Sequence, residues 1–291
     1  PALTALRDHP VLEKLLVSGF SSFAGIDALL RGEKSQLKEL MIHGFKGSPV
    51  EVVGFESFML EMGRNTTILK MCIARVPLSH DNAQLLKAML RRNTVLQDLD
   101  LSGDALGSAG FAEVASALYR NTSIQGLDVS DNGLDDLAAA NTLRELLRRN
   151  KTITRLNLCG NDFGSNVAVV RYFAEGLRAN TTMQELHLSS CELDDQGLSI
   201  LAERLGQQKR CHVNLNLFAN QITCTGLRAL IDNATAALST VTHLNLSNNR
   251  LFDEGASFLA ETLRRQTLPS LKFLQLDGCG MTDNGLVALM S

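Results

Sequence analysis

The chain contains 291 residues, of which 45% are apolar, and its formal net charge is −3. The apolar content suffices for a large buried core, while the small negative charge argues against a nucleic-acid-binding protein, whose ligand is a polyanion. No apolar run approaches the roughly 18 residues that cross a bilayer, and no secretory signal opens the sequence. We therefore expect a protein without a membrane span.

The cysteines show no CxxC motif and no framework spacing. Free thiols are typical of a reducing compartment, so we expect a cytoplasmic protein, or one delivered into a host cytoplasm if it is a bacterial effector. The six cysteines are Cys72, Cys159, Cys191, Cys211, Cys224 and Cys279.

One pattern recurs along almost the whole chain. Residues 124–134 read L-x-x-L-x-L-x-x-N-x-L, with Ile124 and Val129 in place of two leucines, and residues 153–163 are a near copy 29 positions later. Such self-similarity is typical of a repeat protein. The fourth position of the pattern gives ten repeats: Leu15, Leu40, Met71, Leu99, Leu127, Leu156, Leu186, Leu215, Leu244 and Leu274.

The ninth position of the pattern separates regular from irregular repeats. Asn, Asp or Cys at this position can hydrogen-bond the backbone of the turn that leaves the strand. The first three repeats have apolar residues there, so we expect these three to be irregular or capping repeats. The ten residues are Phe20, Phe45, Val76, Asp104, Asn132, Asn161, Cys191, Asn220, Asn249 and Cys279.

A helix is predicted after each strand. The first repeat leaves room for only a short helix, and later repeats show apolar residues at helical spacing. Each of these helices ends in a short polar segment such as Arg92-Asn93-Thr94, here called the corner. We expect the corner Asn to adopt the left-handed conformation and the Arg to face the negative end of the helix dipole. In the eighth repeat, His212 stands where an apolar residue should open the strand, and we expect it to be a structural residue. The predicted helices include residues 26–30, 110–118, 169–177, 197–205 and 255–263.

A strand–helix repeat of this size cannot bury its own apolar face, so the repeats must stack. Because helices are about 10 Å wide and neighbouring strands about 4.8 Å apart, the stack should curve, with a parallel sheet on its concave face. In these features the chain, over about residues 10–291, resembles the leucine-rich repeat proteins of the ribonuclease-inhibitor-like class. The resemblance implies an α/β solenoid, or horseshoe, with helices on the convex face. We expect one domain over residues 1–291, cut from a longer protein.

Outward-facing residues of the predicted strands are the candidates for function. Acidic residues gather on the fourth and fifth repeats, and this favours an acidic surface that attracts a basic protein. A solvated sheet face without a function is the alternative. We expect these residues and one exposed aromatic, Phe218, to contact the partner, while burial of Phe218 beneath a loop is the other possibility. The candidate partner-binding residues are Asp98, Asp100, Asp128, Asp131, Glu185, His187 and Phe218.

Catalysis, a cofactor and a metal have little support. The sequence has no phosphate-binding loop, no GxSxG and no HExxH. Cys72 has no base in its own or neighbouring repeats at the level of the motif, and Asp100 with Asp128 would supply an incomplete set of metal ligands. The recurrent arginines at helix ends could form a phosphate-binding stripe, but the helix dipole already explains them.

We therefore expect a monomeric, non-catalytic protein-recognition module or scaffold that uses its concave face and loops. The resemblance leaves alternatives open: the substrate-recognition domain of a ubiquitin ligase or bacterial effector, the sensor domain of an innate immune receptor, or a GTPase activator. No small-molecule substrate is indicated, and nucleic acid is not the expected partner.

Overall fold

The computed structural model describes residues 9, 11–19, 23–31, 36–44, 53–207 and 214–290. The chain divides into two compact units, residues 1–133 and 134–291, here called the N-terminal unit and the C-terminal unit. A single domain over the whole chain therefore stays a prediction. Phe20, Phe45 and His212 lie outside the described residues, so the roles expected for them are not tested.

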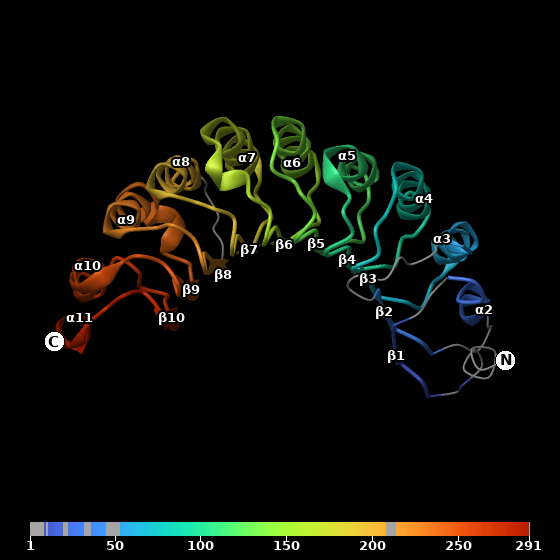
Figure 1. The fold of residues 1–291 in the computed structure, drawn as a ribbon, viewed down its shortest axis with the longest axis horizontal. Coiled ribbons are helices and arrows are strands. Elements are labelled where there is room, and N and C mark those ends of the chain that lie inside the picture. The colour runs from blue at the N-terminus through green and yellow to red at the C-terminus, as the bar shows by residue number, and fades with distance from the viewer. Residues whose placement is uncertain are drawn as a thin grey trace. The chain divides into compact units, whose positions relative to one another are not determined.

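The N-terminal unit consists of alternating strands and helices. Its five strands form a parallel sheet in the order β1-β2-β3-β4-β5, and its helices lie side by side against one face of that sheet (Figure 1). The strands are β1 (Lys14–Ser18), β2 (Glu39–His43), β3 (Lys70–Ala74), β4 (Asp98–Asp100) and β5 (Gly126–Asp128). The helices are α2 (Asp27–Leu30), α3 (Phe55–Arg64), α4 (His80–Leu90) and α5 (Gly107–Leu118).

The C-terminal unit repeats this arrangement with strands in the order β6-β7-β8-β9-β10, all parallel. Its strands are β6 (Arg155–Asn157), β7 (Glu185–His187), β8 (Asn214–Asn216), β9 (His243–Asn245) and β10 (Phe273–Gln275). Its helices are α6 (Leu137–Arg149), the 3₁₀ helix η1 (Phe163–Ser165), α7 (Val167–Ala179), α8 (Asp195–Leu205), α9 (Cys224–Leu238), α10 (Phe252–Arg264) and α11 (Asp283–Met290).

The strand register follows the sequence repeat. Fourth-position residues are direct partners on neighbouring strands, as for Leu99 with Leu127 and Leu186 with Leu215. These four leucines are at most 3% exposed, so they form the core between the sheet and the helices of their unit. The predicted parallel sheet of stacked strand–helix repeats is confirmed.

Four of the five predicted helices begin two or three residues earlier than the apolar periodicity predicted, and two of these, α7 and α8, begin at a polar cap. The predicted helix at residues 197–205 begins at Asp195, where the Asp194 carboxylate accepts a hydrogen bond from the Gly197 N–H at 2.7 Å. The Asp136 carboxylate caps α6 in the same way, through the Ala139 N–H at 2.8 Å. Capping residues carry no apolar signal and are missed by periodicity alone.

Ninth-position side chains link consecutive repeats. Asn132 Nδ2 donates to the Leu101 carbonyl of the preceding repeat at 2.8 Å, and Asn220 Nδ2 donates to the Leu188 carbonyl at 2.8 Å. Cys191 Sγ occupies the equivalent place and donates to the Leu158 carbonyl at 3.3 Å. The position therefore needs a donor that satisfies a buried carbonyl of the repeat before it.

Asp104 departs from this rule because an ionised carboxylate can only accept hydrogen bonds. Its Oδ1 accepts from the Val76 N–H at 2.8 Å, but its Oδ2 is buried and has no hydrogen-bond partner among the described residues. Burial, together with the nearby Asp100 carboxylate, raises the pKa of Asp104 to about 9. At neutral pH the Asp104 side chain is thus a neutral carboxylic acid, which can donate a hydrogen bond as the Asn132 amide does.

The helix-ending corners also differ from the prediction. Asn65, Asn150 and Asn180 have extended backbones, with φ of −65°, −74° and −81°, so the left-handed conformation expected of the corner Asn is wrong. Their side chains instead fix the next turn: Asn180 Oδ1 accepts from the N–H groups of Thr182 and Met183, at 2.9 and 2.8 Å. The corner Asn is needed for its hydrogen bonds, not for its backbone freedom.

Candidate functional site

The side chains at the third and fifth positions of each repeat form the surface of the sheet that faces away from the helices, here called the strand face. In the N-terminal unit, strand pairing sets Asp100 directly beside Asp128, and Asp98 beside Lys70. Neighbouring strands lie about 4.8 Å apart, so the two fifth-position carboxylates are close neighbours. The structure therefore brings together three of the candidate residues: Asp98, Asp100 and Asp128.

Fifth-position residues also have a local structural role that the sequence pattern did not reveal. Asp100 Oδ1 accepts from the Ser102 N–H at 2.9 Å, and Asp128 Oδ1 accepts from the Ser130 N–H at 2.9 Å. Outward-facing residues at this position therefore also stabilise the fold. In the C-terminal unit Asn216 Oδ1 makes the same bond to the Phe218 N–H at 3.1 Å. Since an amide oxygen serves equally well, the turn does not require the negative charges of Asp100 and Asp128.

A histidine, a thiol and a carboxylate lie in contact across three strands of the N-terminal unit. Cys72 Sγ lies 3.3 Å from His43 Nε2 and donates to Asp100 Oδ2 at 3.1 Å. This corrects the expectation that Cys72 has no base nearby. His43 lies at the seventh position of the second repeat, the position that Phe218 has in the eighth, and comparing that position with the fifth position of the next repeat would have found the contact.

The environment of Cys72 does not activate it as a nucleophile. The thiol is 5% exposed, and burial, followed by the Asp100, Asp104 and Asp128 carboxylates, raises its pKa. A reactive cysteine needs the opposite conditions, a lowered pKa and access to solvent. The role of Cys72 in this cluster is therefore to donate a hydrogen bond that holds the Asp100 carboxylate in place on the strand face.

Asp131, the fourth acidic candidate of the N-terminal unit, lies outside the strand. It is exposed and adopts a positive φ of 54° in the turn that follows β5. Asp98, by contrast, is half-buried and faces Lys70, which reduces the local negative potential on that side. The acidic surface is thus strongest around Asp100 and Asp128.

In the C-terminal unit the candidate residues do not form an acidic cluster. Glu185 is paired across the sheet with Arg155 and Asn214, and His187 lies between Asn157 and Asn216. Glu185 and His187 are both half-buried. This part of the strand face is amide-rich and close to neutral.

Two aromatic features stand on the strand side of the C-terminal unit. Phe218 is half-buried, so it is neither fully exposed nor enclosed beneath a loop. Sequence reasoning missed the second feature: the His243 ring stacks on the Phe273 ring at a centroid distance of 4.5 Å, and Phe273 is 58% exposed. Both residues occupy the third position of their repeats, which would have identified the pair.

The part of the chain that the structure describes has neither a metal-binding cluster nor a membrane-spanning helix. There, no group of three His, Cys, Asp or Glu side chains could hold a metal ion. No helix in the same residues combines the length and the apolar character needed to cross a bilayer.

Comparisons with known proteins agree with this architecture. A family model described as Leucine Rich repeat matches residues 179–202, 237–260 and 267–290. The chain is 28% identical over 249 residues to NACHT, LRR and PYD domains-containing protein 12 of Mus musculus, an alignment that covers 75% of this chain and 23% of that protein. Identity to protein 13 of the same series, from Homo sapiens, is 30% over 166 residues, or 48% of this chain and 16% of that protein.

A third relative is shorter. The chain is 28% identical over 244 residues to the ribonuclease inhibitor of Sus scrofa, an alignment that covers 74% of this chain and 53% of the inhibitor. The chain thus spans less than a quarter of the two NACHT-containing relatives and about half of the inhibitor. The recurring motif, the stacked strand–helix repeats and these matches together show that the chain is a leucine-rich repeat protein.

Proposed function

We propose that this chain is a non-catalytic protein-recognition module whose strand face in the N-terminal unit binds a basic surface of another protein. The observation that carries the proposal is the surplus charge at Asp100 and Asp128. Both side chains make a turn that Asn makes in the C-terminal unit, so the carboxylates add charge that the fold does not need.

Electrostatics supports the same partner chemistry. Asp100 and Asp128 are adjacent on paired strands, and the nearby Asp104 and Cys72 are uncharged at neutral pH, so they neither add to nor offset this negative charge. Clustered charge of one sign steers oppositely charged partners and fixes their register. Asp98, Asp131 and, in the C-terminal unit, Glu185, His187 and Phe218 remain proposed contacts.

The test is a charge-only substitution. Asp100→Asn with Asp128→Asn keeps both turns and removes two charges, whereas Glu203→Gln with Asp232→Asn removes two exposed charges from helices of the C-terminal unit. Affinity purification with quantitative mass spectrometry, followed by titration of a labelled oligoarginine peptide, should show binding reduced about tenfold in the first variant and unchanged in the second. If every partner and the peptide bind both variants like the wild type, the proposal is wrong.

A second candidate is that the module is the recognition region of a larger receptor-like protein located in the cytoplasm. The observation that favours it is the similarity to proteins named for NACHT, LRR and PYD domains, of which the alignments cover 23% and 16%. The five free cysteines among the described residues agree with a reducing compartment. Sequencing the encoding transcript tests this: a NACHT domain in the same reading frame supports the candidate, and its absence refutes it.

A further inference from the structure

Two neighbouring helices of the C-terminal unit, α6 and α7, carry a net positive charge. Residues 137–179, which include α6 and α7, contain seven basic and three acidic residues, a net charge of +4, while the whole chain has −3. The remaining residues therefore share a net charge of −7. Positive charge is therefore concentrated in a segment that includes two helices of the C-terminal unit.

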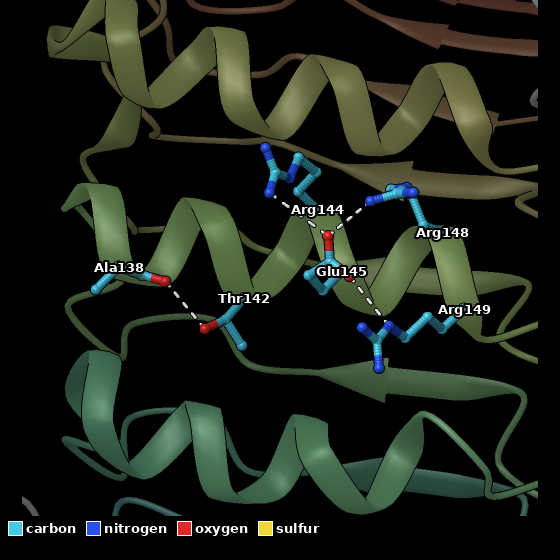
Figure 2. A network of polar contacts seen from close by, with 6 residues as sticks. All are labelled: Ala138, Thr142, Arg144, Glu145, Arg148 and Arg149. Atoms are coloured by element: carbon cyan, nitrogen blue, oxygen red, sulfur yellow. Dashed lines mark hydrogen bonds and ion pairs between the residues drawn. The ribbon is translucent and has the colours of Figure 1, made fainter.

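On α6, one carboxylate gathers three arginines. Glu145 contacts Arg144 Nη2 at 3.5 Å, Arg148 Nη1 at 2.8 Å and Arg149 Nε at 3.0 Å, as Figure 2 shows. Burial raises the pKa of Glu145, but Arg148 and Arg149 outweigh this effect, so its pKa is lowered and it is ionised at neutral pH. One negative charge holds three guanidinium groups in place and leaves a net charge of +2.

The adjacent helix α7 extends this positive surface. The Arg144 guanidinium lies over the Tyr172 ring, 5.0 Å from its centroid. Glu175 of α7 pairs with Arg178 at 3.1 Å and with Arg204 of α8 at 3.0 Å, again with more positive than negative charge. We define the arginine patch by its six members: Arg144, Arg148, Arg149, Arg171, Arg178 and Arg204.

The helix dipole explains part of the arginine patch but not all of it. Arg148, Arg149 and Arg178 lie in the last turns of α6 and α7, where a cation is favoured. Arg171 lies in the first half of α7, is exposed, and makes no ion pair within the described part of the chain. A cation in that half of a helix gains nothing from the dipole, so this charge needs another explanation.

We propose that the arginine patch binds an acidic, Asp- and Glu-rich segment of a partner protein. Guanidinium groups carry five N–H donors each and bind carboxylates in a two-pronged geometry. Arg148 and Arg178 are 53% and 51% exposed, so donors beyond their ion pairs face solvent. Because Glu145 and Glu175 already order the patch, little side-chain entropy remains to be lost on binding.

The size of the patch favours a short acidic segment over a long or flat polyanion. The patch covers two neighbouring helices and the edge of a third, whose axes are typically about 8–10 Å apart. A nucleic acid or an anionic bilayer would extend beyond the patch, and the residues outside 137–179 have a net charge of −7, which repels a polyanion. A short peptide segment can be confined to the patch.

The test measures fluorescence anisotropy of a labelled oligoglutamate peptide with the full chain. Arg148→Glu with Arg149→Glu should weaken binding about tenfold. The matched control is Arg264→Glu with Arg265→Glu, an equivalent Arg pair at the end of α10, which should bind like the wild type. Circular dichroism verifies folding. If the first variant does not fold, Arg171→Glu takes its place, because it breaks no ion pair among the described residues; it should weaken binding about threefold.

Three results would overturn the proposal. The first is no binding of oligoglutamate by the wild type at low ionic strength. The second is an equal loss in the α6 variant and the α10 control, which would indicate general charge attraction. The third is tighter binding of single-stranded DNA or phosphatidylserine vesicles than of the peptide.

Discussion

Replacing Asp104 with Asn should stabilise the protein, and the gain should depend on pH. Asp104 takes the place that Asn132 and Asn220 fill with an amide donor, and its Oδ2 lies buried without a partner among the described residues. The introduced amide would supply the donor permanently. The wild-type carboxyl must instead take up a proton when the chain folds.

The magnitude follows from the pKa of Asp104, which burial raises from 3.8 to about 9. Between these values the folded state holds a proton that the unfolded state releases, so the contribution of Asp104 to stability is most favourable below about pH 4 and falls as the pH rises toward 9. From the unfolded-state pKa of 3.8 to pH 7 is about 3 pH units, and each unit lowers the stability by about 1.4 kcal/mol, so protonating Asp104 on folding costs on the order of 4 kcal/mol at pH 7. Asp104→Asn should remove most of this cost at pH 7 and bring no gain below pH 4.

The assay is urea denaturation followed by far-ultraviolet circular dichroism at several pH values. Asp131→Asn, at an exposed position of the next repeat, is the matched control and should leave the pH dependence as in the wild type. Asp104→Ala removes the same protonation cost but leaves the Val76 N–H without its acceptor, so at pH 7 it should be less stable than Asp104→Asn by about 1–3 kcal/mol. If the wild type and Asp104→Asn show the same pH slope, Asp104 is not protonated in the folded state and the reasoning fails.

Three further predictions concern packing, corners and thiols. Gly176→Ala should lower the free energy of unfolding, measured by thermal denaturation, by about 1–3 kcal/mol, because the added Cβ would lie 2.7 Å from the Arg144 Cα of α6. Gly110→Ala is the control: its Cβ would have no neighbour closer than 3.4 Å, so the stability should not change. Asn180→Ala should lower the free energy of unfolding by about 3 kcal/mol, since the hydrogen bonds of Asn180 to the Leu147 carbonyl and to the N–H groups of Thr182 and Met183 are lost; a loss below about 0.5 kcal/mol would contradict this role. Iodoacetamide labelling followed by mass spectrometry should modify half-buried Cys159 long before Cys72, whose thiol is buried and has a raised pKa; equal rates would refute this.

The strand face shows where sequence reasoning succeeded and where it failed. Alternation along each strand predicted that Asp100 and Asp128 share a face, and the strand register confirms it. The sequence did not reveal that both side chains also hold their turns, because Asn and Asp make this bond equally and the pattern allows either. Contact between His43 and Cys72 was missed because a hydrogen bond between repeats depends on side-chain reach as well as on register.

The sequence by itself determined the repeat architecture. A pattern recurring every 28–30 residues from Met71 onward requires stacked strand–helix repeats, because no single repeat can bury its leucines alone. Tertiary structure decided the properties that depend on burial and on neighbouring repeats. Asp104 is an ordinary acid in the sequence, and only its enclosed position between repeats makes it a neutral carboxylic acid. The arginine patch likewise depends on the tertiary structure, because the ion pairs of Glu145 and Glu175 bring arginines of neighbouring helices onto one surface.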